Sequence, residues 1–87
     1  MRFSARIRYW NPDKASGLAV VDLPDELVRA LGGLKQQKVR GTINSVPYES
    51  NVMPAGGGRL ALSVSRKMMT EAAAGVGSEA EFELERR

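Results

Sequence analysis

The chain contains no cysteine and no histidine. Without cysteine, neither a disulfide framework nor a thiolate nucleophile can form, and without histidine the commonest general base is missing. Zinc sites built from these two residues are therefore excluded. No Ser-x-x-Lys or nucleophile-elbow motif compensates, and Gly56–Gly58 lacks the Lys-Ser/Thr that completes a phosphate loop. We expect no catalytic residue, no metal site and no cofactor; an enzyme relying on Glu, Lys and Ser remains a minor alternative.

Long apolar runs are absent as well. The longest, Leu18–Val21 and Ala72–Ala74, are far too short to span a bilayer, and arginines interrupt the apolar residues near Met1. Together with the absence of disulfides, this predicts a cytoplasmic protein with no membrane partner. The 87 residues, 43% of them hydrophobic, indicate a single domain over residues 1–87 with one modest core.

Alternation of apolar and polar residues is the dominant pattern, and it indicates strands with one buried face. A turn-rich loop is expected at 11–17 and a flexible glycine-rich connection at 54–58. The predicted strands cover six segments: Phe3–Trp10, Leu18–Leu23, Lys38–Asn44, Val46–Met53, Leu60–Val64 and Glu79–Arg86. These strands predict a mainly β protein, a small closed barrel of about six strands.

Two short helices are expected to cap this barrel. The first follows Pro24 and ends at Gly32-Gly33, with an apolar stripe formed by Leu27, Ala30, Leu31 and Leu34. The second is predicted over Arg66–Ala74, with Ser65 as its N-cap, and ends at Gly75.

The terminal strands carry complementary charges. The first presents Arg2, Arg6 and Arg8 on its outer face, and the last presents a row of alternate glutamates, Glu79, Glu81, Glu83 and Glu85. If the two strands pair, these side chains become cross-strand partners. Contact of the arginine row with phosphates is the functional alternative, which we favour less because the glutamates would cancel the attracting field.

The net charge of +3 raises the question of nucleic acid. Residues 35–77 hold six basic side chains against two acidic ones, whereas the flanks hold seven against eight. The excess is mild and central, and a dedicated DNA-binding domain shows a denser basic stripe. Nucleic acid is therefore a possible partner that the sequence does not favour.

Ser65-Arg66-Lys67 breaks a rule of helix electrostatics, because two cations stand where the helix dipole favours acids. Such a first turn can bind an anion, which makes Ser65, Arg66 and Lys67 candidate ligand-binding residues. The neighbouring hairpin adds the candidates Arg40, Asn44 and Ser50. The structural alternative is that Lys67 pairs with Glu71 and that Arg66 points to solvent.

Large side chains offer a similar choice. Trp10 and Tyr48 can stack on a ligand ring, but packing at a barrel mouth and within a hairpin is the favoured interpretation. Met53, Met68 and Met69 are expected to fill gaps under the second helix rather than to line an adaptable cavity.

The order of motifs along the chain resembles a widespread bacterial family of unknown function. The resemblance spans most of the chain and is most specific at Val39-x-Gly41-Thr42-Ile43-Asn44; it also includes Leu23-Pro24, Leu31-Gly32, Pro47, Ser50, Pro54, Gly58 and Gly75-x-Gly77. Some members are fused to a segment of the YdeI/OmpD-associated type. The resemblance implies a double-split β-barrel, similar in outline to AbrB and MazE-type transcription factors.

The chain departs from the family pattern at several positions. Ser45 replaces a usual glycine after Thr-Ile-Asn, which implies a less tight turn. Ser78 replaces a usual aspartate, and Met69 replaces a basic residue, which weakens a family-wide anion site at the second helix. We expect a non-catalytic binding module for a small anionic ligand or a protein partner. The alternative is an AbrB-type DNA-binding regulator, which requires dimerisation; homo-oligomerisation stays open.

Overall fold

A computed structural model describes residues 1–11, 13 and 17–87. Most of the predicted turn-rich loop, residues 12 and 14–16, lies outside the described part. The helices are α1 (Asp25–Ala30) and α2 (Arg66–Glu71). The strands are β1 (Arg2–Arg6), β2 (Arg8–Tyr9), β3 (Ala19–Asp22), β4 (Gln37–Ile43), β5 (Val46–Gly56), β6 (Arg59–Val64) and β7 (Glu79–Arg86). Within the described residues, no helix is long and apolar enough to cross a membrane.

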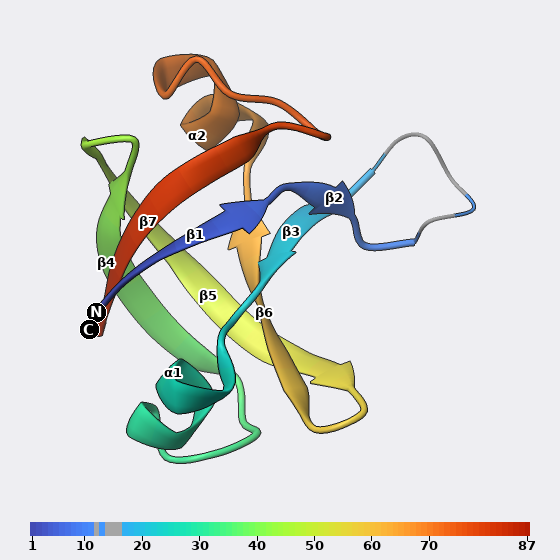
Figure 1. Ribbon diagram of the computed structural model, residues 1–87, viewed down its shortest axis with the longest axis vertical. Helices are drawn as coiled ribbons and strands as arrows, with labels where there is room; N and C mark the ends of the chain where they lie inside the picture. Colours follow the sequence, from blue (N-terminus) through green and yellow to red (C-terminus); the bar gives the residue numbers. More distant parts are fainter. Residues whose placement is uncertain (12, 14–16) are drawn as a thin grey trace.

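The strands form one antiparallel sheet with the order β1-β7-β4-β5-β6-β3-β2. β1 and β2 are consecutive in the chain but form the two opposite edges of the sheet. The edges must therefore come close together, and the sheet coils into a nearly closed barrel (Figure 1). The prediction of a mainly β barrel with two short helices is confirmed. The described strands number seven rather than six because the predicted strand Phe3–Trp10 is split in two.

The split occurs at Ile7, which is fully buried. Its N–H donates to the Ser78 carbonyl at 3.0 Å, and its own carbonyl accepts from the Gly77 N–H at 2.8 Å. At Ile7, these two bonds take the place of regular strand pairing, because the N-terminal segment here leaves β7 and moves beside β3. One N-terminal segment therefore connects both edges of the sheet.

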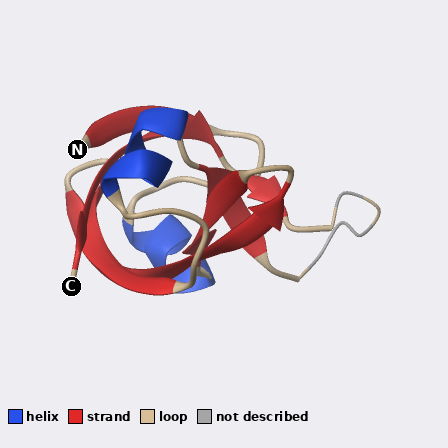
Figure 2. Ribbon diagram, turned by 90° about the horizontal axis from the view of Figure 1, so that it is seen from below, coloured by secondary structure: helices blue, strands red, loops and turns tan. Residues whose placement is uncertain are grey.

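The core lies inside the barrel, and each helix covers one end (Figures 1 and 2). Leu27, Val28 and Leu31 are buried at the α1 end, whereas Leu34 of the predicted stripe is 51% exposed. Leu34 lies beyond the helix because Gly32, at φ 86°, ends it, and the Gly33 N–H donates back to the Val28 carbonyl. Ala30, also of the predicted stripe, is exposed.

The second helix is also shorter than predicted, since it ends at Glu71 instead of Ala74. Ala73 adopts the left-handed conformation at φ 54°, and the Ala74 N–H donates to the Met69 carbonyl at 2.9 Å. This is the same terminating motif that glycine makes in α1. The sequence gives no sign of it, because alanine is the best helix former and rarely adopts this conformation.

Both hairpins around β5 turn in two residues. Asn44 (φ 48°) and Ser45 (φ 70°) connect Ile43 to Val46, so the expectation of a looser turn at Ser45 is wrong. Gly57 and Gly58 likewise connect β5 to β6. The expected flexible connection at 54–58 is instead the end of a longer strand, with an irregularity between Pro54 and Gly56, and a tight turn.

The terminal strands pair as predicted. Arg2 lies opposite Glu83 and forms an ion pair with it at 3.1 Å, and Arg6 lies opposite Glu79. The prediction was wrong for Arg8, which belongs to β2 and therefore faces β3 rather than the glutamate row.

Candidate functional site

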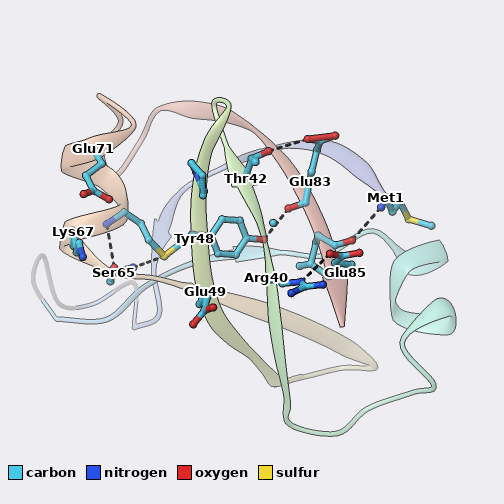
Figure 3. A pocket seen from close by; sticks show the side chains of 14 residues that line it. Met1, Arg40, Thr42, Tyr48, Glu49, Ser65, Lys67, Glu71, Glu83 and Glu85 are labelled. Carbon is cyan, nitrogen blue, oxygen red and sulfur yellow. Dashed lines mark hydrogen bonds and ion pairs between the residues drawn. The ribbon is translucent and has the colours of Figure 1, made fainter. Parts of the chain in front are cut away.

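A pocket of ≈ 810 Å³ opens between the β4–β5 hairpin and α2 (Figure 3). We call it the hairpin–helix pocket. Its volume lies within the usual range for ligand sites. Four elements and the N-terminus supply its lining: Met1, Arg40, Gly41, Thr42, Pro47, Tyr48, Glu49, Ser65, Lys67, Met68, Glu71, Glu83, Leu84 and Glu85.

Ser65 sets the start of α2. Its hydroxyl accepts a hydrogen bond from the Met68 N–H at 3.1 Å, while its own N–H donates to the Met68 sulfur at 3.4 Å. The predicted N-cap is thus confirmed. The first turn contains no acid and two cations, Arg66 and Lys67. Met68 is 6% exposed and packs in the core as expected, but it also forms part of the pocket wall.

Two side chains hold α2 beside the first half of β5. At one end, the Ser50 hydroxyl donates to the Ser63 carbonyl at 2.6 Å. At the other end, the Asn44 amide donates to the Ala72 carbonyl at 3.3 Å, and its oxygen accepts from the Glu81 N–H at 3.0 Å. Because Ser63 precedes α2 and Ala72 follows it, the helix runs antiparallel to β5.

Tyr48 occupies the middle of the pocket, between the α2 side chains and Glu83 (Figure 3). It is 6% exposed, and its hydroxyl donates to the Glu83 carbonyl at 3.0 Å. The residue opposite Tyr48 is Gly41, where a Cβ would overlap that same carbonyl oxygen. Glycine is thus required for the close approach of β4 and β7. Burial raises the pKa of Tyr48 well above its ordinary value, so the phenol stays protonated.

Most charged groups of the pocket are already paired. Glu83 accepts hydrogen bonds from Arg2 and from the Thr42 hydroxyl, and these bonds, the Arg2 bond foremost, hold the pKa of Glu83 below its ordinary value. Two further ion pairs involve charged residues of the pocket lining: Arg40 with Glu85 at 2.9 Å and Arg87 with Glu49 at 2.7 Å.

Among the charged side chains that line the pocket, Lys67 and Glu71 are the exceptions within the described part of the chain. Both line the pocket, and neither forms an ion pair with the other or with any further side chain that the structure describes. The Lys67–Glu71 pair considered from the sequence is therefore not formed. Two opposite charges, one helical turn apart, thus line the pocket with no ion-pair partner in the described part of the chain.

The six predicted site residues separate into three groups. Ser65, Lys67 and Arg40 line the hairpin–helix pocket. Asn44 and Ser50 make the internal hydrogen bonds that hold α2. Arg66 lies on a second hollow of ≈ 580 Å³ next to Leu18, Met69 and Val76.

Sequence reasoning missed the central place of Tyr48 and Glu83. In a hairpin with a two-residue turn at 44–45, Tyr48 lies opposite Gly41. This register, which can be derived from the sequence, indicates that Tyr48 lies over the one position without a side chain.

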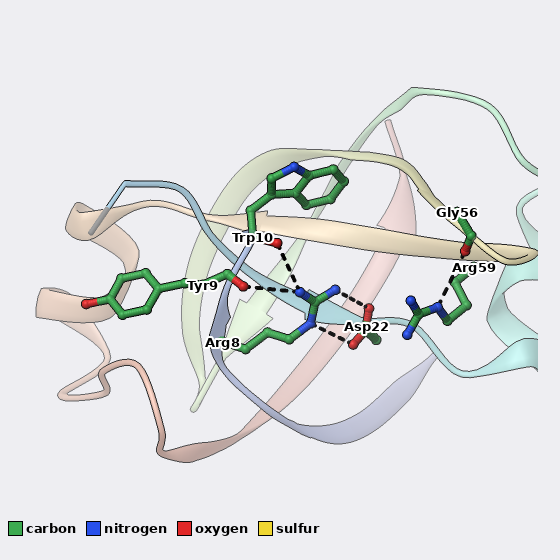
Figure 4. Close-up of polar contacts among 6 residues, drawn as sticks. All are labelled: Arg8, Tyr9, Trp10, Asp22, Gly56 and Arg59. Atoms are coloured by element: carbon green, nitrogen blue, oxygen red, sulfur yellow. Dashed lines mark hydrogen bonds and ion pairs between the residues drawn. The ribbon is translucent and has the colours of Figure 1, made fainter. Parts of the chain in front are cut away.

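Trp10 and Arg8 lie apart from the pocket. The Arg8 guanidinium binds both Asp22 oxygens at 2.9 Å and also donates to the Tyr9 and Trp10 carbonyls (Figure 4). This hydrogen bonding keeps the pKa of Asp22 below its ordinary value. The predicted packing of Trp10 at the barrel mouth is incomplete, since its side chain is 37% exposed.

Two titratable groups at the centre of the pocket, Tyr48 and Glu83, are poorly suited to proton transfer at neutral pH. Glu83 has a lowered pKa and Tyr48 a raised one, so both are displaced away from neutrality. Among the described residues, no group of three acidic side chains is placed to hold a metal ion. The arrangement can bind a polar ligand through unpaired charges and hydrogen-bonding groups.

Comparison with known protein families identifies the family of the chain. Residues 3–84 match the family described as "Domain of unknown function (DUF1905)", so the chain belongs to that family. This confirms the resemblance to a family of unknown function. No curated protein matches the chain.

Proposed function

We propose that this member of the DUF1905 family is a non-catalytic binding module whose ligand occupies the hairpin–helix pocket. The observation that carries the proposal is that the side chains of Lys67 and Glu71 line a preformed pocket without an ion pair among the described residues, whereas the other charged side chains of its lining are paired. Unpaired charged groups on a rigid frame are available to a ligand without first breaking an internal contact.

The charge balance of the pocket bears on the kind of ligand. Arg40 and Lys67 contribute two positive side chains, whereas Glu49, Glu71, Glu83 and Glu85 contribute four negative ones. A free anion would therefore meet Lys67 but also the unpaired carboxylate of Glu71. A ligand with both charges, such as a segment of a protein partner, satisfies both groups. Of the two ligand classes that the sequence suggests, the protein partner is better supported.

The ion pairs around the pocket argue against a surface that binds nucleic acid. Arg2, Arg40 and Arg87 are each bound to a glutamate, so they are not free to neutralise phosphates. A cytoplasmic location is compatible with a chain that needs no disulfide.

An amide NMR titration tests the proposal. The ¹⁵N-labelled protein is titrated with citrate, inorganic phosphate, a duplex oligonucleotide and short peptides that carry both charges. We expect the peptides to shift the amides of Tyr48, Glu49, Lys67 and Glu71. Lys67→Ala should weaken these shifts, whereas the matched control Arg66→Ala, which lies on the other hollow, should not. Perturbations confined to other surfaces, or equal loss in both variants, would contradict the proposal.

A further inference from the structure

Among the described residues, the first half of β5 pairs with another strand on one side only. All of Val46–Val52 pairs with β4, but pairing with β6 begins at Val52. The chain leaves β6 at Val64 and turns into α2, so no strand of the described residues pairs with 46–51, although the Ser50 side chain still reaches Ser63 at the end of β6. The hairpin–helix pocket, which also extends over β4 and β7, reaches this edge, with Pro47 and Glu49 in its lining.

The register shows which backbone groups face the gap. In a two-residue hairpin, Ile43 and Val46 exchange both hydrogen bonds, and every second residue after Val46 does the same with β4. The intervening residues therefore point their backbone groups away from β4. These groups are the Pro47 carbonyl and the Glu49 N–H and carbonyl. Within the described residues, β6 does not pair with this segment, and no turn or loop bond engages these groups.

The spacing of the unpaired charges matches an extended chain. Lys67 and Glu71 lie four residues apart on α2, a rise of about 6 Å along the axis. In a strand, residues two apart face the same side and lie about 6.8 Å from each other. A strand added beside β5 can therefore place two successive same-side residues opposite Lys67 and Glu71.

We propose that the hairpin–helix pocket binds an extended segment of another polypeptide, which adds to the free edge of β5 as an antiparallel strand. Such a strand runs parallel to α2, because α2 is antiparallel to β5, so it meets Lys67 before Glu71. The segment therefore carries an acidic residue followed, two positions later, by a basic one. Strand addition of this kind takes its affinity from main-chain bonds and its specificity from side-chain contacts.

The edge is selective rather than generally adhesive. Pro47 has no N–H, and Glu49 carries a charge, two features that keep sheet edges from pairing with arbitrary strands. The free edge offers one donor and two acceptors beside a charged pair. This is enough to hold a short segment in one register.

The inference rests on the proposed function, and its test uses two capped pentapeptides. Acetyl-Thr-Glu-Val-Lys-Thr-amide has the expected charge order, and acetyl-Thr-Lys-Val-Glu-Thr-amide has the reverse. We expect the first to bind more tightly and to protect the Glu49 amide from hydrogen exchange. In the free protein, this amide should exchange much faster than those of Tyr48 and Ser50, which bond to β4.

Two substitutions of Glu49 distinguish recognition through the backbone from recognition through the side chain. Glu49→Pro removes the outward N–H without removing a β4 ladder bond, and Glu49→Thr keeps that N–H. Both lose the carboxylate that binds Arg87, so they are matched. We expect Glu49→Pro to bind about 3- to 10-fold more weakly than Glu49→Thr, because the two variants differ in the outward N–H that the added strand would use. If Glu49→Pro does not fold, peptides N-methylated at each central residue in turn test the same bonds. N-methylation should weaken binding only at every second residue of the peptide, because only alternate N–H groups of an added strand point toward β5.

Each outcome has a defined meaning. Binding at pocket residues that ignores N-methylation and Glu49→Pro overturns strand addition but leaves the binding module intact. Slow exchange of the Glu49 amide in the free protein, or its protection by self-association without peptide, also overturns the inference. Failure of both the pentapeptides and the earlier ligand panel to shift pocket amides removes the proposed function itself.

Discussion

Gly41 is the residue whose replacement tests the architecture of the pocket most sharply. A Cβ at this position would overlap the Glu83 carbonyl oxygen, and it would lie 2.6 Å from the Glu83 carbonyl carbon and 3.0 Å from the Leu84 Cα. Ordinary carbon–carbon contacts are about 3.5–4.0 Å, so β4 and β7 must separate by about 1 Å. Both obstacles are backbone atoms, which cannot rotate away as a side-chain tip can.

The energetic cost of Gly41→Ala has two parts. Overpacking against a rigid neighbour costs about 1–3 kcal/mol. The separation also strains the bond from the Tyr48 hydroxyl to the Glu83 carbonyl, a contribution of about 1 kcal/mol. We therefore expect a loss of about 3 kcal/mol from the total of roughly 4–13 kcal/mol typical of 87 residues.

Thermal and urea denaturation measure this loss. For a domain of this size, about 3 kcal/mol corresponds to a fall in Tm of about 12–24 °C. Gly75→Ala is the control, because a Cβ there meets no atom and the backbone is not left-handed. It should change stability by less than about 1 kcal/mol. If Gly41→Ala is as stable as Gly75→Ala, the required close approach of β4 and β7 is refuted.

Three further predictions concern single residues. Ser45→Gly should stabilise the protein by about 0.5–1 kcal/mol in urea denaturation, because Ser45 is left-handed at φ 70° in a turn that favours glycine; no gain would speak against this turn geometry. Ala73→Gly should give a similar gain for the same reason at the end of α2, and an unchanged unfolding midpoint would argue that the helix continues past Ala73. Asp22→Asn should cost about 1 kcal/mol at pH 7, since Asp22 is bound in bidentate fashion by Arg8. Because the folded-state pKa of Asp22 lies below its usual 3.8, this stability is present above that pH and is lost as the pH falls through the folded value, so wild type and Asp22→Asn should converge in acid; a gap independent of pH would contradict the ion pair.

The pocket shows where sequence reasoning succeeds and where it stops. The sequence predicts Ser65 as an N-cap because capping is a local interaction between a side chain and the next turn. The unusual place of Lys67 in that turn makes it a candidate, and it lines the pocket. Asn44 and Ser50 are sequence candidates as well, but they make internal bonds to Ala72 and Ser63, the residues on either side of the α2 turn. Only the three-dimensional arrangement distinguishes a polar group that holds the frame from one that faces a ligand.

The β character, the number of helices, the central hairpin and the pairing of the terminal strands can be read from the amino-acid sequence alone. They follow from alternation, caps and turn residues, which act over a few neighbouring positions. The division of the first strand at Ile7, the approach of β7 to Gly41 and the free edge of β5 exist only in the folded chain. Each depends on where the sheet must open or bend to close a barrel of limited circumference, and that is decided by strands far apart in the sequence.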